Sequence, residues 1–196
     1  MNAKDYIIQL GKIALSSQIT SENIDGKIFS YSDGIEAMCS MVSELSKRNA
    51  KLLFIGNGGS AGISSHCAID FWRNGRIPAM CFNDGALLTC ISNDFGYEEV
   101  FAKPIEMFAT EGDLLIAISS SGSSENILNG AKMASSKGCG VITLSGFSED
   151  NPLRRLGDLN LFVPSVSYGY VELAHQIALH TVLDLILEEK ISGSTL

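Results

Sequence analysis

The sequence has little basic charge, few histidines and no long apolar run. Its 196 residues include 14 Lys and Arg against 22 Asp and Glu, which gives a formal net charge of -8. That balance excludes a broad phosphate-tracking surface, so we expect no nucleic acid partner. A small phosphorylated ligand is still allowed, because backbone amides and hydroxyl groups can hold it.

Membrane and export signals are also lacking. No apolar run approaches the roughly 18 residues of a spanning helix, and the opening stretch MNAKDYIIQLGK lacks the apolar core of a signal peptide. We therefore expect a cytoplasmic protein with no membrane partner. The five cysteines are an odd number without a C-x-x-C pair, which favours reduced core thiols over disulfides or a zinc ribbon.

The apolar content is sufficient for one folded domain. Hydrophobic residues make up 45% of the chain and charged residues 18%, which is typical of a globular protein. No internal repeat, low-complexity tract or linker divides the sequence. We expect a single domain over residues 1–196.

The hydrophobic periodicity predicts alternating strands and helices after a helical N-terminus. Residues 2–20 and 33–48 read as two amphipathic helices, the second capped by Ser32 or Asp33. Short apolar runs follow at 51–55, 77–82, 113–119, 139–144 and 158–163, with helical stretches at 61–73, 85–92, 97–109, 124–137 and about 170–190. This order predicts an α/β fold: a five-stranded parallel sheet with helices on both faces, preceded by two N-terminal helices. Ligands of such sheets bind at the carboxyl ends of the strands.

A glycine-rich loop, Gly56-Asn57-Gly58-Gly59-Ser60, follows the first apolar run and opens a helix. Its glycines allow close approach of the backbone to a ligand, and the helix N-terminus offers free N–H groups to an anion. Two other interpretations remain open for this loop. It can be a tight structural turn, or the G-x-G-x-x-A pattern at 56–61 can be a dinucleotide fingerprint with Asp84 as its ribose-binding acid.

A serine-rich loop favours a phosphate monoester over a dinucleotide. Residues 119–126, Ser-Ser-Ser-Gly-Ser-Ser-Glu-Asn, follow the third apolar run and open another helix. The hydroxyls are neutral donors that can hold a phosphate and release it again, and Ser124 can also cap the helix. A dinucleotide fold has no need of this second loop. The alternative is a polar loop with a helix cap and no ligand.

Two of the three histidines share a helix face with a carboxylate. His66 and Asp70 are four residues apart, and Glu172 precedes His180 by eight. Two helices that each offer an imidazole and a carboxylate could enclose a divalent metal. They could equally supply an acid–base pair without a metal. His175 lies on a different side of its helix and is expected to pack.

Together these segments resemble the SIS, or sugar isomerase, family of phosphosugar-binding domains. The resemblance covers nearly the whole chain through GNGGS at 56–60, NDFG at 93–96, EGDLLIAISSSGSSENI at 111–127 and GCGVITLSG at 138–146. It is strongest to the branch that interconverts sedoheptulose 7-phosphate and a heptose 7-phosphate. The resemblance implies a homotetramer with active sites at subunit interfaces, in which the N-terminal helices within residues 2–48 serve oligomerisation.

The resemblance also implies roles for individual residues. The serine loop would hold the phosphate, while GNGGS and NDFG would contact the sugar. The matching residues are Ser119, Ser120, Ser121, Ser124, Asn57, Gly58, Gly59, Ser60, Asn93 and Asp94. Zinc and catalysis would depend on His66 with Asp70 and on Glu172 with His180. Asp70 stands where the family has Glu, and Glu172 stands where it has Gln.

We therefore expect an aldose–ketose isomerase of a phosphorylated sugar, with Zn²⁺ as its cofactor. The reaction moves a proton between C1 and C2 through an enediol, with Asp70 as base, His180 as acid, and Glu172 helping to hold the metal or taking part itself. A metal would stabilise the enediolate. The first alternative is a non-catalytic phosphosugar-binding or protein-partner SIS protein, which would not need His66 and His180. The second is an NAD-dependent enzyme.

Overall fold

The computed structural model describes residues 1–21 and 27–193. The N-terminal part contains two helices, α1 (Ala3–Leu15) and α2 (Tyr31–Arg48), and two short strands between them, β1 (Gln18–Ser21) and β2 (Lys27–Phe29). The predicted helix over 2–20 is therefore too long, since its last residues form a strand. The predicted cap of α2 is also wrong: the Ser30 side chain accepts from the backbone N–H of Asp33.

The rest of the chain alternates strands and helices as the sequence predicts, except that the predicted helix over 97–109 is divided into a 3₁₀ turn and a shorter helix. The strands are β3 (Leu52–Gly56), β4 (Ala79–Cys81), β5 (Leu114–Ser119), β6 (Gly140–Ser145) and β7 (Leu159–Phe162). The helices are α3 (Gly59–Arg73), α4 (Gly85–Phe95), α5 (Ala102–Phe108), α6 (Glu125–Ser136) and α7 (Tyr168–Gly193), with 3₁₀ turns η1 (Tyr97–Glu99) and η2 (Pro152–Arg155). None of the helices in the described part combines the length and apolar character needed to cross a bilayer.

One sheet joins all these strands in the order β2-β1-β7-β6-β5-β3-β4. Its five predicted strands are all parallel, which confirms the α/β fold. The hairpin of β1 and β2 adds two antiparallel strands at the β7 edge, so the described sheet has seven strands rather than five. Gly34 on α2 allows this arrangement, because a Cβ there would collide with Ile19 of β1.

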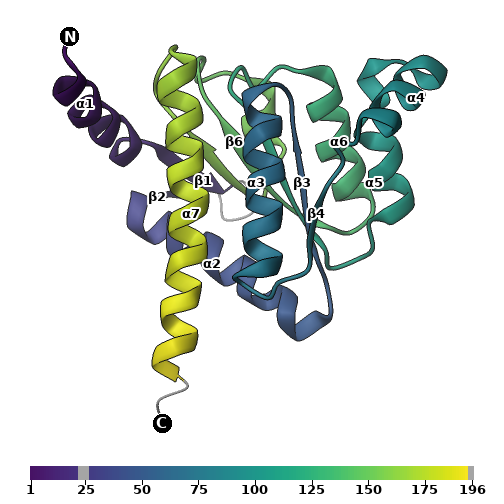
Figure 1. The fold of residues 1–196 in the computed structure, drawn as a ribbon, viewed down its shortest axis with the longest axis horizontal. Coiled ribbons are helices and arrows are strands. Elements are labelled where there is room, and N and C mark those ends of the chain that lie inside the picture. The colour runs from purple at the N-terminus through teal and green to yellow at the C-terminus, as the bar shows by residue number, and fades with distance from the viewer. Residues whose placement is uncertain (22–26, 194–196) are drawn as a thin grey trace.

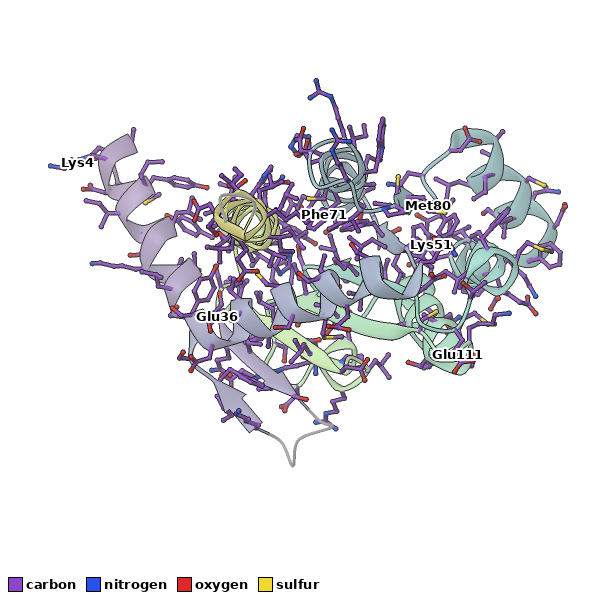
Figure 2. The ribbon with its side chains drawn as sticks, turned by 90° about the horizontal axis from the view of Figure 1, so that it is seen from below. Lys4, Glu36, Lys51, Phe71, Met80 and Glu111 are labelled. Carbon is purple, nitrogen blue, oxygen red and sulfur yellow. The ribbon has the colours of Figure 1, made fainter. Side chains whose placement is uncertain are left out.

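Helices cover both faces of the sheet, as predicted. Alternate strand residues point to opposite sides, so Phe54 and Ile116 belong to one buried cluster and Ile55 and Leu115 to the other. Helices α2, α3 and α7 pack on the first face, and α5 and α6 pack on the second. Figure 1 shows α3 and α7 side by side, and Figure 2 shows the same two helices nearly end-on.

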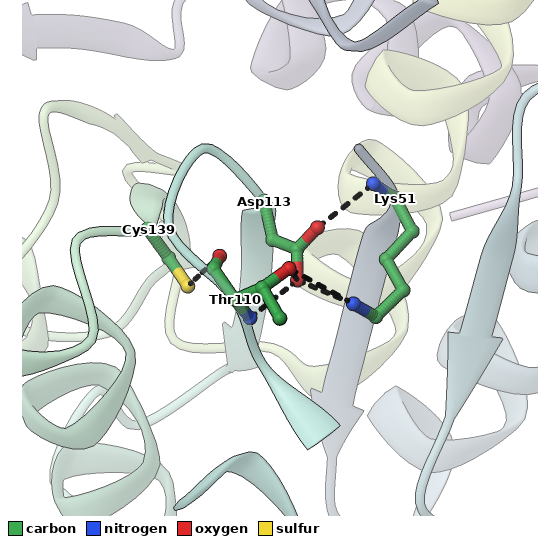
Figure 3. A network of polar contacts seen from close by, with 4 residues as sticks. All are labelled: Lys51, Thr110, Asp113 and Cys139. Atoms are coloured by element: carbon green, nitrogen blue, oxygen red, sulfur yellow. Dashed lines mark hydrogen bonds and ion pairs between the residues drawn. The ribbon is translucent and has the colours of Figure 1, made fainter. Parts of the chain in front are cut away.

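The two ends of the parallel strands carry different features; the side where the strands end is the carboxyl edge, and the side where they begin is the amino edge. At the carboxyl edge, the glycine loop after β3 and the serine loop after β5 are neighbours, because Gly56 pairs with Ile118. At the opposite edge, Asp113 lies fully buried and accepts hydrogen bonds from Lys51 and Thr110 (Figure 3). The carboxyl edge is therefore the place to look for a ligand site, and the opposite edge holds a structural ion pair.

Candidate active site

The glycine loop is shaped by close backbone contacts. Gly58 has φ of +54°, a region that favours glycine, and a Cβ at Gly56 would meet the backbone of Ser60. Gly58 is also the N-cap of α3 and supplies no side-chain cap. The first N–H groups of α3 are therefore free for an anion.

Some hydroxyl groups of the serine loop have hydrogen-bonding capacity that the loop itself does not fill. The Ser119 hydroxyl donates to Ser124 Oγ at 3.4 Å and also accepts from the Gly122 N–H. Ser120 Oγ is buried and has no hydrogen-bond partner among the described residues. Ser124 is the N-cap of α6, but its side chain makes no capping hydrogen bond, so the predicted capping role is wrong. A buried hydroxyl without a partner is costly unless a ligand or water completes it.

The two loops enclose one small cavity of about 240 Å³. Eight of the ten predicted substrate-binding residues line it: Asn57, Gly58, Gly59, Ser60, Ser119, Ser120, Ser121 and Ser124. Ile118, Tyr168 and Glu172 complete the wall. Glu172 is the only charged residue among the described residues that line the cavity, and these otherwise offer a phosphate neutral amide and hydroxyl donors.

Asn93 and Asp94 do not line this cavity. They lie near the end of α4, both exposed, where the Asn93 side-chain amide donates to Asp94 Oδ1 at 2.9 Å. Asp84, which the dinucleotide interpretation needed as a ribose-binding acid, instead caps α4 by accepting from the Leu87 N–H at 3.0 Å. The structure thus gives Asp84 a local role at the start of a helix.

Three polar residues around the cavity were missed by sequence reasoning. Tyr97 and Asn126 hydrogen-bond to the Asn57 side chain. Tyr168 reaches the cavity from the start of α7 and packs edge-on against Phe147, with ring centroids 4.8 Å apart. Asn126 lies within the serine-loop motif, but nothing in the sequence indicates its partner, which is 69 residues away.

Three of the four predicted metal ligands lie together on α3 and α7. Asp70 Oδ2 is 3.1 Å from His66 Nε2 and 4.0 Å from His180 Nε2. One ligand atom from each residue lies within 4.8 Å of the other two. Ligands about 2.0–2.2 Å from a tetrahedral Zn²⁺ are separated by roughly 3.3–3.6 Å. The donor types suit a zinc ion with three protein ligands. The 3.1 Å His66–Asp70 distance is near this range, whereas the 4.0 Å Asp70–His180 distance would have to shorten on binding.

Glu172 is not part of this group. It lies at the cavity, where a Cβ on Gly59 would collide with its carboxylate, and it is about 12 Å along α7 from His180 by helix rise. The predicted four-ligand arrangement is therefore not formed among the described residues. His175 is fully buried, as packing predicts, and contacts Ser145 O at 3.0 Å. Burial lowers the His175 pKa to about 4, so this imidazole stays neutral.

The cavity and the histidine–aspartate group lie along the same pair of helices. Gly59 and His66 are seven residues apart on α3, which corresponds to about 10 Å of helix rise. A phosphate in the cavity and the reacting end of its sugar near Asp70 would thus be separated by a distance of that order. Seven bonds from C2 to phosphorus in an extended seven-carbon sugar phosphate span about 8 Å, at roughly 1.2 Å per bond.

Comparisons with known proteins define the class to which this fold and cavity belong. The SIS domain family matches residues 22–146. Phosphoheptose isomerase from Aliarcobacter butzleri is 35% identical over 86% of this chain and 92% of its own length. The corresponding values for the enzyme from Campylobacter concisus are 36%, 79% and 84%. The structure of phosphoheptose isomerase GmhA from Neisseria gonorrhoeae superposes with a TM-score of 0.78, at 27% identity and 91% coverage of both chains.

The chain therefore belongs to the SIS domain family and, within it, to the phosphoheptose isomerases.

Proposed function

We propose that this protein is an aldose–ketose isomerase that converts sedoheptulose 7-phosphate to a heptose 7-phosphate through an enediol. Its relatives named phosphoheptose isomerase support this reaction. The observation that carries the proposal is the position of Asp70 and His180. Both lie beside His66 on the two helices that begin at the hydroxyl-lined cavity. A protein that only binds phosphosugars would need the cavity but not this group.

The cavity between the two loops holds the phosphate in this proposal. Ser119, Ser120, Ser121 and Ser124 donate hydroxyls, and the N-terminal amides of α3 add backbone donors. The unpartnered Ser120 hydroxyl gains an acceptor when a phosphate enters. Because Glu172 is the one charged residue that the described part of the chain contributes to the lining, neutral donors hold the phosphate there. Asn93 and Asp94 remain proposed sugar contacts that would have to approach from outside the cavity.

The reacting end of the sugar lies at the histidine–aspartate group. Without a bound metal, Asp70 is the base that moves the proton between C1 and C2, and His180 serves the carbonyl and hydroxyl oxygens as acid. With a metal bound by these residues, His180 would give up its place at the oxygens to the ion. The Asn74 amide donates to Asp70 Oδ1 at 3.4 Å, while the other carboxylate oxygen faces the two imidazoles. Asp70 is one methylene shorter than the Glu that the family has at this position, so the placement of its carboxylate relative to the substrate matters for catalysis.

We further propose that His66, Asp70 and His180 hold Zn²⁺. Two imidazole nitrogens and one carboxylate oxygen are typical catalytic zinc ligands, and three protein ligands leave a position open. When bound, the ion would polarise the carbonyl and stabilise negative charge on its oxygen. His66→Ala should abolish metal uptake, measured by elemental analysis. If active protein contains no metal and chelation leaves the rate unchanged, Asp70 and His180 work as a bare acid–base pair.

A homotetramer is part of the proposal, and it is supported by apolar side chains left in solvent. Ile69 and Trp72 on α3 and Leu173 and Ile177 on α7 are exposed, on the two helices that carry the histidine–aspartate group. On α1, Ile7 and Ile8 are exposed as well. Such surfaces favour association with further copies. Light scattering should give a tetramer mass, and a monomer mass at every concentration would contradict this.

The central experiment incubates the purified protein with sedoheptulose 7-phosphate, with and without Zn²⁺, and follows the aldose product by NMR. His66→Ala tests the histidine–aspartate group, where the reacting end of the sugar would lie. Ser119→Ala with Ser121→Ala tests the phosphate end, and calorimetry should show weaker phosphosugar binding, by about 1 to 1.5 kcal/mol per lost hydrogen bond. Binding without turnover in the metal-loaded protein would favour the non-catalytic alternative.

A further inference from the structure

The side chain of Asn57 is held from two sides by residues of other elements. Asn57 and Asn126 form a reciprocal amide pair, with N···O distances of 2.9 and 3.0 Å. The Tyr97 hydroxyl lies 3.0 Å from Asn57 Oδ1 and donates to it. Asn57 is in the loop after β3, Tyr97 is in η1, and the 3% exposed Asn126 is at the start of α6.

The Tyr97 hydroxyl contacts the oxygen end of the Asn57 amide in the structure. A carboxamide has both a donor and an acceptor, so the pair with Asn126 is satisfied equally well when both amides are turned over. A phenolic hydroxyl can donate to Oδ1 or accept from Nδ2, so Tyr97 fixes the plane of the Asn57 amide, and in the orientation of the structure it donates to Oδ1. This hydrogen bond occupies the second lone pair of Oδ1 and leaves one N–H of Asn57 Nδ2 without an acceptor among the described residues.

Neither Tyr97 nor Asn126 reaches the substrate cavity. Asn57 lines that cavity, and it also lines a neighbouring one of about 310 Å³ together with Tyr97 and Asn126. Asn57 thus forms part of the wall between the two cavities, and its two partners approach from the far side. Ser124, which lines both cavities, precedes Asn126 by two residues, so one helix start carries both a serine of the phosphate loop and the partner of Asn57.

We propose that Tyr97 and Asn126 are positioning residues that hold Asn57 with its free N–H toward the bound phosphosugar. This inference rests on the proposed substrate site. The oxygens of an ionised phosphate only accept hydrogen bonds, so an Asn57 that presents Oδ1 would repel the ligand where the observed orientation attracts it. Because this contact is remote from C1 and C2, it acts on the ground state and the transition state alike, and its loss appears in KM.

The test removes one oxygen atom from the Tyr97 side chain. Tyr97→Phe should raise the KM for sedoheptulose 7-phosphate about two- to tenfold with kcat retained. The matched control is Asn129→Ala. Asn129 is also on α6, and its amide donates to Glu98 O of the same turn at 3.2 Å, so the variant loses a bond between α6 and η1 without touching Asn57. Its KM should not change, and an equal rise in KM would overturn the inference.

A double-mutant cycle separates this inference from the substrate site on which it rests. Asn57→Ala should raise KM, and adding Tyr97→Phe to it should change KM no further, because Tyr97 acts only through Asn57. A Tyr97→Phe effect that persists in the Asn57→Ala background, or no effect in either background, would overturn the positioning role alone. An unchanged KM in Asn57→Ala would instead remove Asn57 from the substrate site.

Discussion

The buried ion pair at the amino edge of the sheet allows a stability prediction with a definite size. Asp113 accepts from the backbone N–H groups of Lys51 and Thr110, at 3.0 and 2.8 Å, and from the Lys51 ammonium at 2.6 Å (Figure 3). Asp113→Ala leaves these donors without their acceptor, at a site where the carboxylate was fully buried. The Lys51 side chain is 27% exposed, so its ammonium can turn to water, and the cost comes mainly from the two orphaned backbone N–H groups, at about 1–3 kcal/mol each. For a chain of this length a loss of about 2–6 kcal/mol lowers the Tm by about 4–24 °C.

Calorimetry at one fixed protein concentration measures this loss, because an oligomer's Tm depends on concentration. The control is Glu106→Ala, which breaks an ion pair with Lys103 of 3.1 Å in which the Glu106 side chain is 52% exposed. Exposed pairs contribute at most about 1 kcal/mol. If Asp113→Ala keeps a Tm as close to the wild-type value as Glu106→Ala does, the reasoning about the buried carboxylate is wrong.

The same carboxylate predicts a pH dependence. Burial by itself raises the pKa of Asp113, but hydrogen bonds from Lys51 and Thr110 outweigh it and hold the pKa below its ordinary value of 3.8. A lowered folded pKa means that the stabilisation is complete above 3.8 and is lost as the pH falls through the folded value. The Tm gap between wild type and Asp113→Asn should therefore narrow in acid. A gap that stays constant from about pH 7 to pH 3 would contradict this.

Two further predictions follow from individual residues. Gly59→Ala should raise the KM with little change in Tm, because its methyl group displaces the flexible end of Glu172 from the cavity wall rather than the backbone; a normal KM would argue against Glu172 at the substrate. In a thiol titration near pH 8 the exposed Cys90 should react first, whereas burial raises the Cys67 pKa to about 12 and delays its reaction. Burial likewise raises the pKa values of Cys39 and Cys139, both to about 11. Equal rates at Cys67 and Cys90 would show that the core around α3 opens readily.

The five parallel strands were predictable because each is short and apolar, and all except the edge strand β4 are largely buried. β5 is buried along its whole length, and such strands read as continuous hydrophobic runs. The hairpin of β1 and β2 was not predictable in this way. Its strands have four and three residues and include polar ones, so only the pairing of Ile19 with Leu161 of β7 identifies the first as a strand. That pairing joins segments more than a hundred residues apart in the chain.

The histidine–aspartate group was only partly determined by local spacing. His66 and Asp70 meet because four residues make about one helical turn, and the sequence states this directly. His180 joins them because α3 and α7 pack side by side on the sheet. Glu172 was grouped with His180 by helix face alone, although eight residues of rise separate the two by about 12 Å. Counting length as well as face would have separated Glu172 from His180, and only the packing of α7 against α3 places it at the cavity.

Local features can be predicted from the amino-acid sequence: the order of strands and helices after α2, the two loops at the carboxyl edge, and the pair of residues on one turn of α3. Those features depend on side-chain periodicity and on the backbone freedom of glycine, which act over a few residues. The tertiary structure decided which distant groups meet. Asn57 finds Tyr97 and Asn126, and Asp70 finds His180, only after the strands are ordered and α7 is laid beside α3. Such contacts depend on packing between elements, which the local pattern of residues along the chain does not reveal.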